Sequence, residues 1–214
     1  MKTLIVTGGT GGLGETVVRR LSQTYRCVLL YHSTPPDTAP NVEGLKADLN
    51  DESSIRAAIA QIDEPYGLVH LAGGYAGGSV SETATETWQK MIGLNLTSSF
   101  FVVRESLARM KRGQPGRIVA ISSEASTSKL ASAAAYTISK AGLNTLIELT
   151  AAELAGTGIT ANALLPGSLD TPATRKWMPN AKLVSLEQVS GTIEFLLSDA
   201  AAAITGALIP LRAS

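Results

Sequence analysis

The fold of this chain is decided at the stretch Thr7-Gly8-Gly9-Thr10-Gly11-Gly12-Leu13-Gly14, which stands between an apolar run at residues 3–7 and a helical run at residues 15–21. Glycines at such a junction permit a tight turn, close approach of the backbone to a pyrophosphate, and close packing of the helix on the strand. The first N–H groups of the helix are free to bind phosphate oxygens. The stretch therefore predicts a dinucleotide site, and a glycine turn without a ligand is the alternative.

Short apolar, β-branched runs alternate with longer segments of helical period along the rest of the chain, which is typical of βαβ units around a parallel sheet. The expected strands cover residues 3–7, 27–31, 44–47, 67–71, 117–122, 160–165 and 207–211. We therefore predict an α/β fold: a single-domain, Rossmann-like, doubly wound parallel sheet of about seven strands with helices on both faces. Residues 1–214 form this one dinucleotide-binding and catalytic domain.

Two helical segments and one loop stand out between the strands. After Tyr136, apolar residues recur at helical spacing as far as Leu154, and Gly156 follows. Residues 88–107 are apolar around more of the helix than one buried face needs, which indicates a second packing surface such as a subunit interface. The proline-rich residues 33–40 predict a loop rather than a domain boundary.

Composition excludes several classes of partner. Lys and Arg number 18 and Asp and Glu number 18, so no net charge attracts nucleic acid or an acidic membrane. Cys27 is the one cysteine, which excludes a disulfide framework and a cysteine metal site. The first residues show no secretory signal, and no apolar stretch approaches the roughly 20 residues of a membrane span. We expect a cytoplasmic protein without a metal.

Further motifs follow the glycine stretch in a fixed order. They are Asp48-Leu49, Leu71-Ala72-Gly73, Asn95, Ser123, Tyr136, Lys140, and Pro166-Gly167 with Thr171. Together with the glycine stretch, they resemble the motifs of the short-chain dehydrogenase/reductase family over essentially the whole chain. The resemblance implies an NAD(P)H-dependent oxidoreductase that transfers a hydride between nicotinamide and a small carbonyl or alcohol substrate. It also implies a catalytic tetrad of Asn95, Ser123, Tyr136 and Lys140, and a homodimer or homotetramer.

The same resemblance, extended to the end of the second expected strand, gives the cofactor contacts. Asp48 matches the acidic residue near the adenine ring, and the loop from Pro166 to Thr171 matches the one that holds the nicotinamide amide. The expected contacts are Gly8, Thr10, Gly11, Gly12, Leu13, Gly14, Tyr31, His32, Ser33, Asp48, Leu49, Ala72, Gly73, Tyr136, Lys140, Pro166, Gly167, Leu169 and Thr171.

Tyr136 and Lys140 are four residues apart at the start of a helix, so their side chains share one face. A phenol with a pKa of about 10 is a poor base at neutral pH, and a nearby ammonium lowers that pKa. Lys140 is therefore expected to tune Tyr136. Ser123 is expected to donate a hydrogen bond to the substrate carbonyl oxygen, and Ser122 is its competitor, facing the other side of the strand. By resemblance, Asn95 holds a water in a proton relay.

Each of these residues also has a structural interpretation. Ser123 could cap a strand, Asn95 could satisfy backbone groups, Tyr136 could edge the core, and Lys140 could be solvated. The joint spacing favours the catalytic interpretation. A dinucleotide-binding regulator without turnover is the alternative from another class, and it has no chemical need for a tuned phenol. His70, in an apolar strand, is interpreted as a satisfied core histidine.

Cofactor preference depends on Tyr31-His32-Ser33 at the end of the second expected strand. An NAD site commonly places Asp or Glu there, where the carboxylate binds the ribose hydroxyls and repels a 2′-phosphate. No carboxylate is present here, which favours NADP(H). Neither Arg nor Lys is present either, so NAD(H) stays open.

The substrate lid is expected at residues 170–184, and its short length predicts a small or open pocket. Residues 72–78 and 169–179 resemble the dihydropteridine reductase branch, which implies a quinonoid pterin as an alternative substrate. That branch does not rely on a serine at the position of Ser123, so a general ketone, quinone or acyl-carrier carbonyl reductase is the broader prediction. Arg175 and Lys176 are either solvated or anion-binding, and Tyr75 and Trp177 could stack on a planar substrate.

Overall fold

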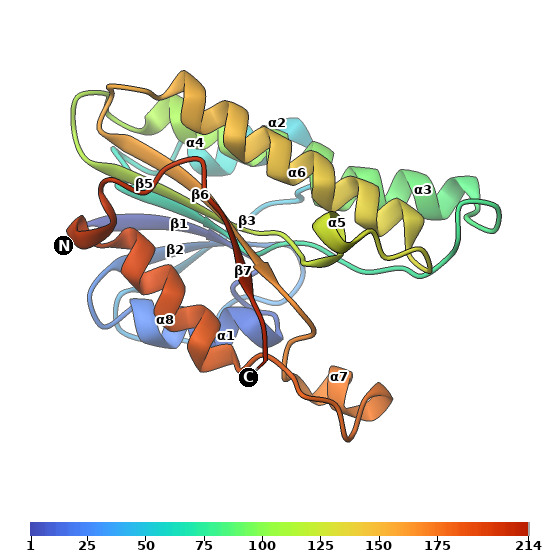
Figure 1. Cartoon of the computed structure of the whole chain (residues 1–214). Helices are drawn as coiled ribbons and strands as arrows, with labels where there is room; N and C mark the ends of the chain where they lie inside the picture. Colours follow the sequence, from blue (N-terminus) through green and yellow to red (C-terminus); the bar gives the residue numbers. More distant parts are fainter. Residues whose placement is uncertain (214) are drawn as a thin grey trace.

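The computed structural model describes residues 1–213 and contains one parallel sheet of seven strands (Figure 1). The strand order is β3-β2-β1-β4-β5-β6-β7, so the sheet is doubly wound outward from β1 and β4. The predicted Rossmann-like fold is confirmed. The strands are β1 (Thr3–Thr7), β2 (Arg26–Tyr31), β3 (Val42–Lys46), β4 (Gly67–His70), β5 (Gly116–Ile121), β6 (Ile159–Pro166) and β7 (Leu208–Leu211).

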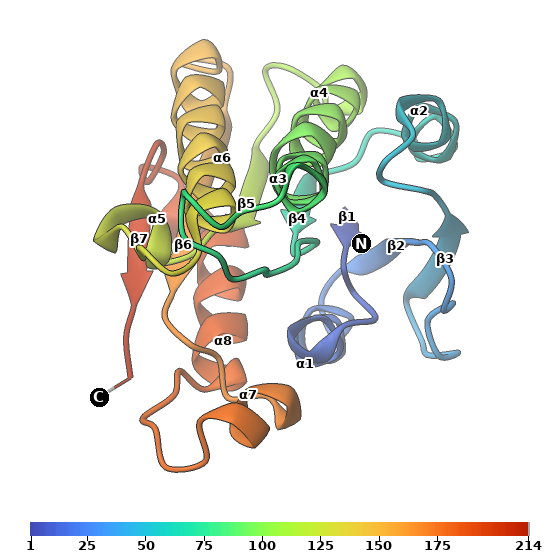
Figure 2. The same cartoon turned by 90° about the vertical axis from the view of Figure 1, so that its right-hand side faces the viewer.

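Helices cover both faces of the sheet. Figure 2 shows α2, α4 and α6 on one side and α1 and α8 on the other, with α7 standing away from the sheet. The helical elements are α1 (Gly12–Leu21), α2 (Glu52–Ile59), α3 (Thr85–Ile92), η1 (Gly93–Thr97), α4 (Ser98–Arg109), α5 (Ala125–Ser128), α6 (Ala134–Glu153), α7 (Pro172–Trp177), α8 (Leu186–Leu197) and η2 (Asp199–Ala201). Across residues 1–213, no helix joins the length and the apolar character that crossing a membrane requires.

The alternation of side chains along the strands fills two separate cores. On β1, Ile5 packs into the cluster beneath α2, α4 and α6, whereas Leu4 and Val6 pack into the cluster beneath α1 and α8. Because both faces are covered, the strands read as continuous apolar runs rather than as alternating ones. This is why the strands were recognisable in the sequence.

The third strand differs from its expected bounds of 44–47. It begins at Val42, which pairs with Cys27 of β2. β3 is one of the two edge strands of this sheet, and its exposed Glu43 and Lys46 give it no apolar run. The loop predicted at residues 33–40 is confirmed, and its Pro36 lies over Gly44 of this strand.

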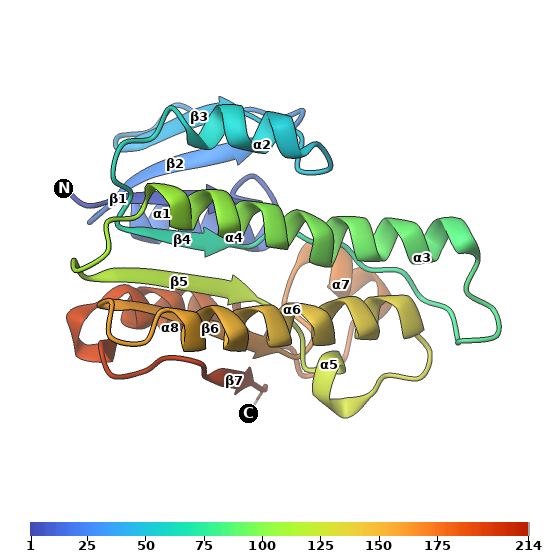
Figure 3. The ribbon, with the colours of Figure 1, turned by 90° about the horizontal axis from the view of Figure 1, so that it is seen from above.

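The helix expected at residues 88–107 is built from three parts. α3 and α4 are joined by η1, a turn of π-helix that contains Asn95 (Figure 3). A π-turn inserts an extra residue into the helix and is frequent at functional sites. The apolar pattern alone did not reveal it, because helical segments on both sides continue in the same direction.

The glycine stretch holds the tight junction between β1 and α1. Gly8 has a φ of +68°, a left-handed conformation that L side chains rarely adopt. A Cβ on Gly14 would lie 2.1 Å from the carbonyl oxygen of Gly8, so the backbone of α1 lies directly against the turn. The junction therefore has no room for a side chain at Gly14.

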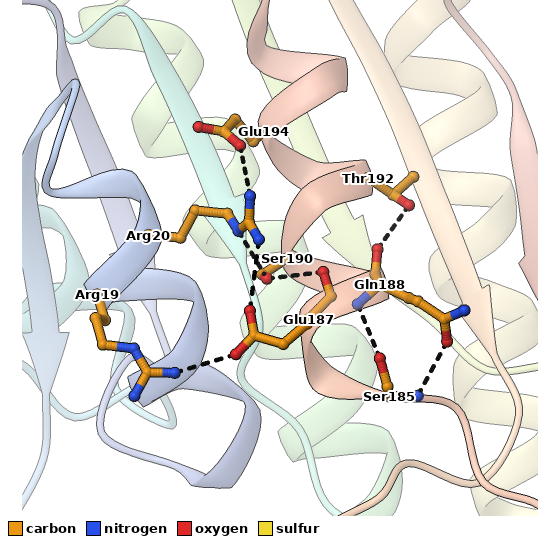
Figure 4. A network of polar contacts seen from close by, with 8 residues as sticks. All are labelled: Arg19, Arg20, Ser185, Glu187, Gln188, Ser190, Thr192 and Glu194. Carbon is orange, nitrogen blue, oxygen red and sulfur yellow. Dashed lines mark hydrogen bonds and ion pairs between the residues drawn. The ribbon is translucent and has the colours of Figure 1, made fainter.

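A polar network that no sequence pattern indicated joins α1 to α8. Figure 4 shows Arg19 and Arg20 of α1 facing Glu187, Ser190 and Glu194 of α8. Arg20 donates to Glu194 at 2.9 Å and to Ser190 at 3.1 Å, and Arg19 donates to Glu187 at 3.1 Å. The helix after the glycine stretch is thereby tied to the helix after the expected lid.

We expect Gly14→Ala to lower the free energy of unfolding by about 3 kcal/mol, because the new methyl group overlaps the Gly8 carbonyl. The matched control is Gly191→Ala within α8, where a Cβ meets no atom within 4 Å. That control should stabilise the protein by about 0.5–1 kcal/mol through helix propensity. Urea denaturation of both variants checks this, and equal stabilities would contradict the close contact.

Candidate active site

The predicted site residues meet at the carboxyl edge of the sheet. β1, β4, β5 and β6 are parallel, and β1 pairs with β4, β4 with β5, and β5 with β6. The segments that follow these strands therefore lie beside one another. In open parallel sheets, ligands bind outside the carboxyl ends, where the strand order reverses. Here that point lies between β1 and β4.

Close contacts join these segments in sequence around the edge. A Cβ on Gly8 would lie 2.7 Å from the nitrogen of Ala72, and one on Gly12 would lie 3.6 Å from Cγ2 of Thr171. The N–H of Glu124, directly after Ser123, donates to the carbonyl of Pro166 at 3.0 Å. The glycine stretch, the Ala72-Gly73 turn, the segment after β5 and the loop after β6 thus surround one site.

The start of α1 is suited to a phosphate group. Its N-cap is Gly11, and no side chain caps the helix. Gly11 and Gly12 are exposed, so the first residues of the helix are accessible to a ligand. Free N–H groups together with the helix dipole favour an anion at this position. Thr10 lies in the same turn, while Leu13 packs partly against the core.

Because Gly73 has no side chain, two predicted catalytic residues, Asn95 and Lys140, can both lie against it. A Cβ on Gly73 would lie 2.8 Å from Oδ1 of Asn95 and 3.0 Å from Nζ of Lys140. Any larger residue at this position would displace one of these side chains. The Ala72-Gly73 turn is therefore part of the site through its lack of bulk.

The side chain of Asn95 is fully buried and hydrogen-bonds to Gly74 in the turn that follows β4. Its Oδ1 accepts a hydrogen bond from the N–H of Gly74 at 2.8 Å. Its Nδ2 donates to the carbonyl of Gly74 and to Oγ of Ser139, each at 3.0 Å. The amide is fully used by the protein, so it orders the turn. A role in a proton relay stays a prediction.

Tyr136 lies between Ser123 and Tyr75. Burial of the phenol raises the pKa of Tyr136 above its usual value, and the neighbouring Ser123 hydroxyl lowers it by a smaller amount. The ring of Tyr75 packs edge-on against that of Tyr136, with centroids 5.1 Å apart. Tyr75 is 63% exposed, so it forms an open wall beside the phenol.

Lys140 lies four residues after Tyr136 on α6, and its expected effect on the pKa of the phenol stays a prediction. Its own ammonium is buried, and burial lowers the pKa of Lys140 to about 8. Nζ donates to the carbonyl of Ile121 at 2.8 Å. The spacing of four residues predicts that Tyr136 and Lys140 lie on the same face of the helix. Their pKa shifts depend on desolvation, which is set by the surrounding fold.

The two serines after β5 face different partners. Oγ of Ser122 donates to the backbone carbonyl of Lys140 at 3.2 Å, which turns it toward α6. Oγ of Ser123 accepts the N–H of Ala125 at 3.2 Å and meets Tyr136. The geometry favours Ser123 over Ser122 as the residue beside the phenol.

The end of β2 supplies a partly polar surface. Tyr31 is half-buried, and His32 and Ser33 are exposed. Nε2 of His32 lies 3.8 Å from Oδ2 of Asp48, whose Oδ1 accepts from the N–H and side chain of Asn50. The carboxylate of Asp48 therefore already bonds to Asn50 and lies near His32.

The hydrophobic members of the expected cofactor set pack inward. Leu49 lies partly buried against the core cluster beneath α2, and Leu169 lies partly buried against the cluster beneath α8. Gly167 donates its N–H to the carbonyl of Leu211 on β7 at 2.9 Å. Leu49, Leu169 and Gly167 would therefore contact a ligand through backbone atoms rather than through side chains.

The segment expected to form the lid is held together by contacts between its own residues. Leu169 bridges Val184 at its base, and Thr171 caps α7 by accepting the N–H of Thr174 at 3.1 Å. Arg175 donates to both carboxylate oxygens of Asp170, at 2.7 and 2.8 Å. Arg175 is therefore engaged in shaping the lid, whereas Trp177 on α7 is 87% exposed.

A chain of buried polar groups beside the site had no recognisable sequence signal. It consists of Thr7, His70, Ser99, Asn95 and Ser139, and it links β1, β4, α4, η1 and α6. Both ring nitrogens of His70 are hydrogen-bonded, which confirms that it is a satisfied core histidine. Isolated Ser and Thr residues have no diagnostic spacing, so only the fold brings these together.

A family model described as short chain dehydrogenase matches residues 2–182. The chain is 30% identical to the 3-oxoacyl-[acyl-carrier-protein] reductase MabA of Mycobacterium bovis, over 98% of this chain and 91% of that protein. The chain belongs to the short-chain dehydrogenase/reductase family and is an oxidoreductase of that family.

Solved structures agree with this assignment. A short-chain type dehydrogenase/reductase from Mycobacterium ulcerans superposes with a TM-score of 0.91 at 25% identity, covering 99% of this chain and 88% of that chain. A variant of the actinorhodin polyketide ketoreductase, solved with NADPH, superposes with a TM-score of 0.87 at 26% identity, covering 99% and 96%. The family generally depends on a pyridine nucleotide.

Burial of Lys140 predicts a pH-dependent stability difference between the protein and its Lys140→Met variant. The lysine releases its proton near pH 8 when folded and near 10.5 when unfolded. Between these values the unfolded chain binds more protons, so the wild-type free energy of unfolding rises with pH. Relative to the variant, the wild type should gain about 3 kcal/mol from pH 8 to pH 10.5. Urea denaturation across this range measures the difference, and a constant difference would contradict the burial.

Proposed function

We propose that this protein is an NADP(H)-preferring carbonyl reductase that transfers a hydride to a small ketone, with Tyr136 as the proton donor. The observation that carries the proposal is that Tyr136, with Ser123 beside its phenol, lies one helical turn before Lys140, which meets Asn95 at Gly73. A protein that only senses a dinucleotide has no use for a phenol and a hydroxyl aimed at the same point.

The residues present fit a nicotinamide dinucleotide. The exposed, uncapped start of α1 and the glycines against the Ala72 turn form a cradle that side chains would fill. Gly8, Thr10, Gly11, Gly12, Leu13 and Gly14 would hold the pyrophosphate, and Pro166, Gly167, Leu169 and Thr171 would hold the nicotinamide amide. When bound, the dinucleotide supplies or accepts the hydride.

The chain's own residues supply the proton and the polar contacts. Ser123 and Tyr136 hydrogen-bond the carbonyl oxygen and stabilise the negative charge that develops there. Burial raises the pKa of Tyr136, so the phenol is protonated at neutral pH and can donate its proton to that oxygen. Lys140 holds the ammonium charge beside the turn, and Asn95 keeps the turn in place.

The open surface at the end of β2 supports the preference for NADP(H). Tyr31, His32 and Ser33 present no carboxylate to repel a 2′-phosphate, and His32 stands beside Asp48, which is bonded to Asn50. A structural relative was solved with NADPH. NAD(H) use would then be the weaker activity.

The substrate class is supported by relatives and by the lid. Relatives are named as 3-oxoacyl reductases and polyketide ketoreductases, which act on a ketone. In this chain, Arg175 is bound to Asp170 and so is not available to bind a substrate anion. We propose a small, uncharged ketone or 3-oxoacyl group, and a quinonoid dihydropterin is the second substrate to include in the test.

A homo-oligomer is also proposed. Apolar side chains are exposed on the segment indicated as a second packing surface and on α6: Trp88 on α3, Phe100 on α4, and Ile138 and Leu149 on α6. Burying such side chains between copies of the chain removes apolar area from water.

The mechanism predicts that Tyr136→Phe lowers kcat by about 10³-fold and that Ser123→Ala lowers it by about 10²-fold, because each loses a contact to the developing oxyanion. Dinucleotide affinity should be retained in both. The measurement is nicotinamide absorbance over a panel of ketones, 3-oxoacyl thioesters, quinones and quinonoid dihydropterin.

The matched control is Tyr25→Phe, which removes a phenolic hydroxyl whose one hydrogen bond within residues 1–213 is to the carbonyl of Leu197. It should leave kcat unchanged. A Tyr136→Phe variant as active as this control would overturn the mechanism. Firm dinucleotide binding without turnover of any substrate would favour the regulatory alternative.

Cofactor preference predicts a higher kcat/KM with NADPH than with NADH. His32→Asp should lower the ratio of the two values on the order of ten-fold, since the new carboxylate repels a 2′-phosphate and accepts ribose hydroxyls. Side-by-side kinetics with both cofactors measure the ratio. A wild-type preference for NADH would contradict the assignment.

A further inference from the structure

A buried polar chain runs from the turn after β4 to the π-turn that carries Asn95. The N–H of Ala72 donates to Oγ1 of Thr7 at 3.3 Å, and Oγ1 of Thr7 lies 2.8 Å from Nδ1 of His70. On the far side of the imidazole, Nε2 lies 2.8 Å from Oγ of Ser99, whose hydroxyl is 2.8 Å from the carbonyl of Asn95. Thr7, His70, Asn95 and Ser99 are all fully buried.

The direction of each hydrogen bond follows from its partners. A carbonyl can only accept, so the hydroxyl of Ser99 donates to Asn95 and has no proton left for the imidazole. Nε2 of His70 must therefore carry a proton and donate to Ser99. In a neutral ring Nδ1 is then an acceptor, and it receives the hydroxyl of Thr7. One tautomer satisfies every member of the chain.

The surroundings keep this imidazole neutral. Burial, together with the smaller effect of the nearby positive charge of Lys140, lowers the pKa of His70 to about 3. Two of the groups that touch His70 are hydroxyls, and neither can neutralise a cation. A second positive charge beside the ammonium of Lys140 would be unfavourable in this dry region.

We propose that His70, with Ser99, is a positioning residue for the reaction: it couples the strand ends that carry the dinucleotide turn to the backbone of Asn95. The proposal rests on the proposed function, because it concerns the same site. Asn95 in turn holds Gly74 and contacts Ser139 on α6, one residue before Lys140. Loss of the Ser99 contact would free the Asn95 carbonyl and loosen the π-turn, so Asn95 and the Gly73 turn would shift relative to Lys140.

The kinetic test compares two serines of the same helix. Ser99→Ala removes the donor to Asn95 and should lower kcat roughly 10- to 100-fold, because small displacements in an active site have effects of this size. The affinity for NADPH, measured by protein fluorescence, should be unchanged. Ser106→Ala is the matched control, since Ser106 is also fully buried on α4 and its hydroxyl has no hydrogen-bond partner within residues 1–213.

Conservative rescue separates positioning from simple packing. His70→Gln retains an N–H that can reach Ser99 and should keep more of the wild-type kcat than His70→Leu, with both variants compared at equal fractions folded. Equal kcat values for Ser99→Ala and Ser106→Ala, or for the Gln and Leu variants, would overturn the proposal.

A measurement independent of turnover tests the same inference. The chain has two histidines, so the ring nitrogens of His70 can be assigned by ¹⁵N NMR with His32→Gln as the reference for the second set of signals. We expect a protonated Nε2 and an unprotonated Nδ1 from about pH 5 to 8, the range in which unperturbed histidines change charge. Titration in this range, or a protonated Nδ1, would overturn the inference. Absence of ketone turnover would refute the proposed function. The NMR spectrum would still show whether Nε2 of His70 carries the proton that Ser99 is inferred to accept.

Discussion

Parallel pairing of β1 with β4 is the constraint on which the rest of the site depends. Thr7 pairs with His70, so the two strands end side by side and their following turns are forced into contact. A side chain at Gly8 would therefore collide with the backbone of Ala72, and a side chain at Gly73 would collide with Asn95 and Lys140. The strand order reverses at this point, which leaves the edge open to a ligand. Glycines are required on both sides because two backbones and the side chains of Asn95 and Lys140 share this space.

Much of this arrangement could be predicted from the sequence, because apolar runs and glycines report directly on buried strands and tight turns. The central strands were found within one or two residues, whereas the edge strand β3 started earlier than expected because its half-exposed residues carry no apolar run. The spacing of Tyr136 and Lys140 placed both on one helix face. Their pKa shifts could not be predicted, since desolvation depends on what the whole fold places around each group.

The site combines a protonated phenol, a buried amine and a neutral imidazole within one polar region. Each state is a consequence of burial: burial disfavours the phenolate of Tyr136, the ammonium of Lys140 and the imidazolium of His70. The surrounding carbonyls and hydroxyls satisfy the hydrogen bonds that remain, as Ile121 does for Lys140 and Ser99 does for His70. Water is largely excluded from such a region, so in the proposed reaction hydroxyl groups beside the carbonyl oxygen would stabilise its negative charge with little screening by water.

Transfer of deuterium from reduced nicotinamide is the most direct test of the central claim that these residues form a site for hydride transfer. The protein would be incubated with NADPH carrying deuterium at the transferable position of C4 and with a 3-oxoacyl thioester, and the product would be analysed by mass spectrometry. We predict an alcohol that contains one deuterium on its carbinol carbon, formed by the wild type and about 10³-fold more slowly by Tyr136→Phe. An alcohol without deuterium, or labelled alcohol formed equally fast by Tyr136→Phe, would contradict the account.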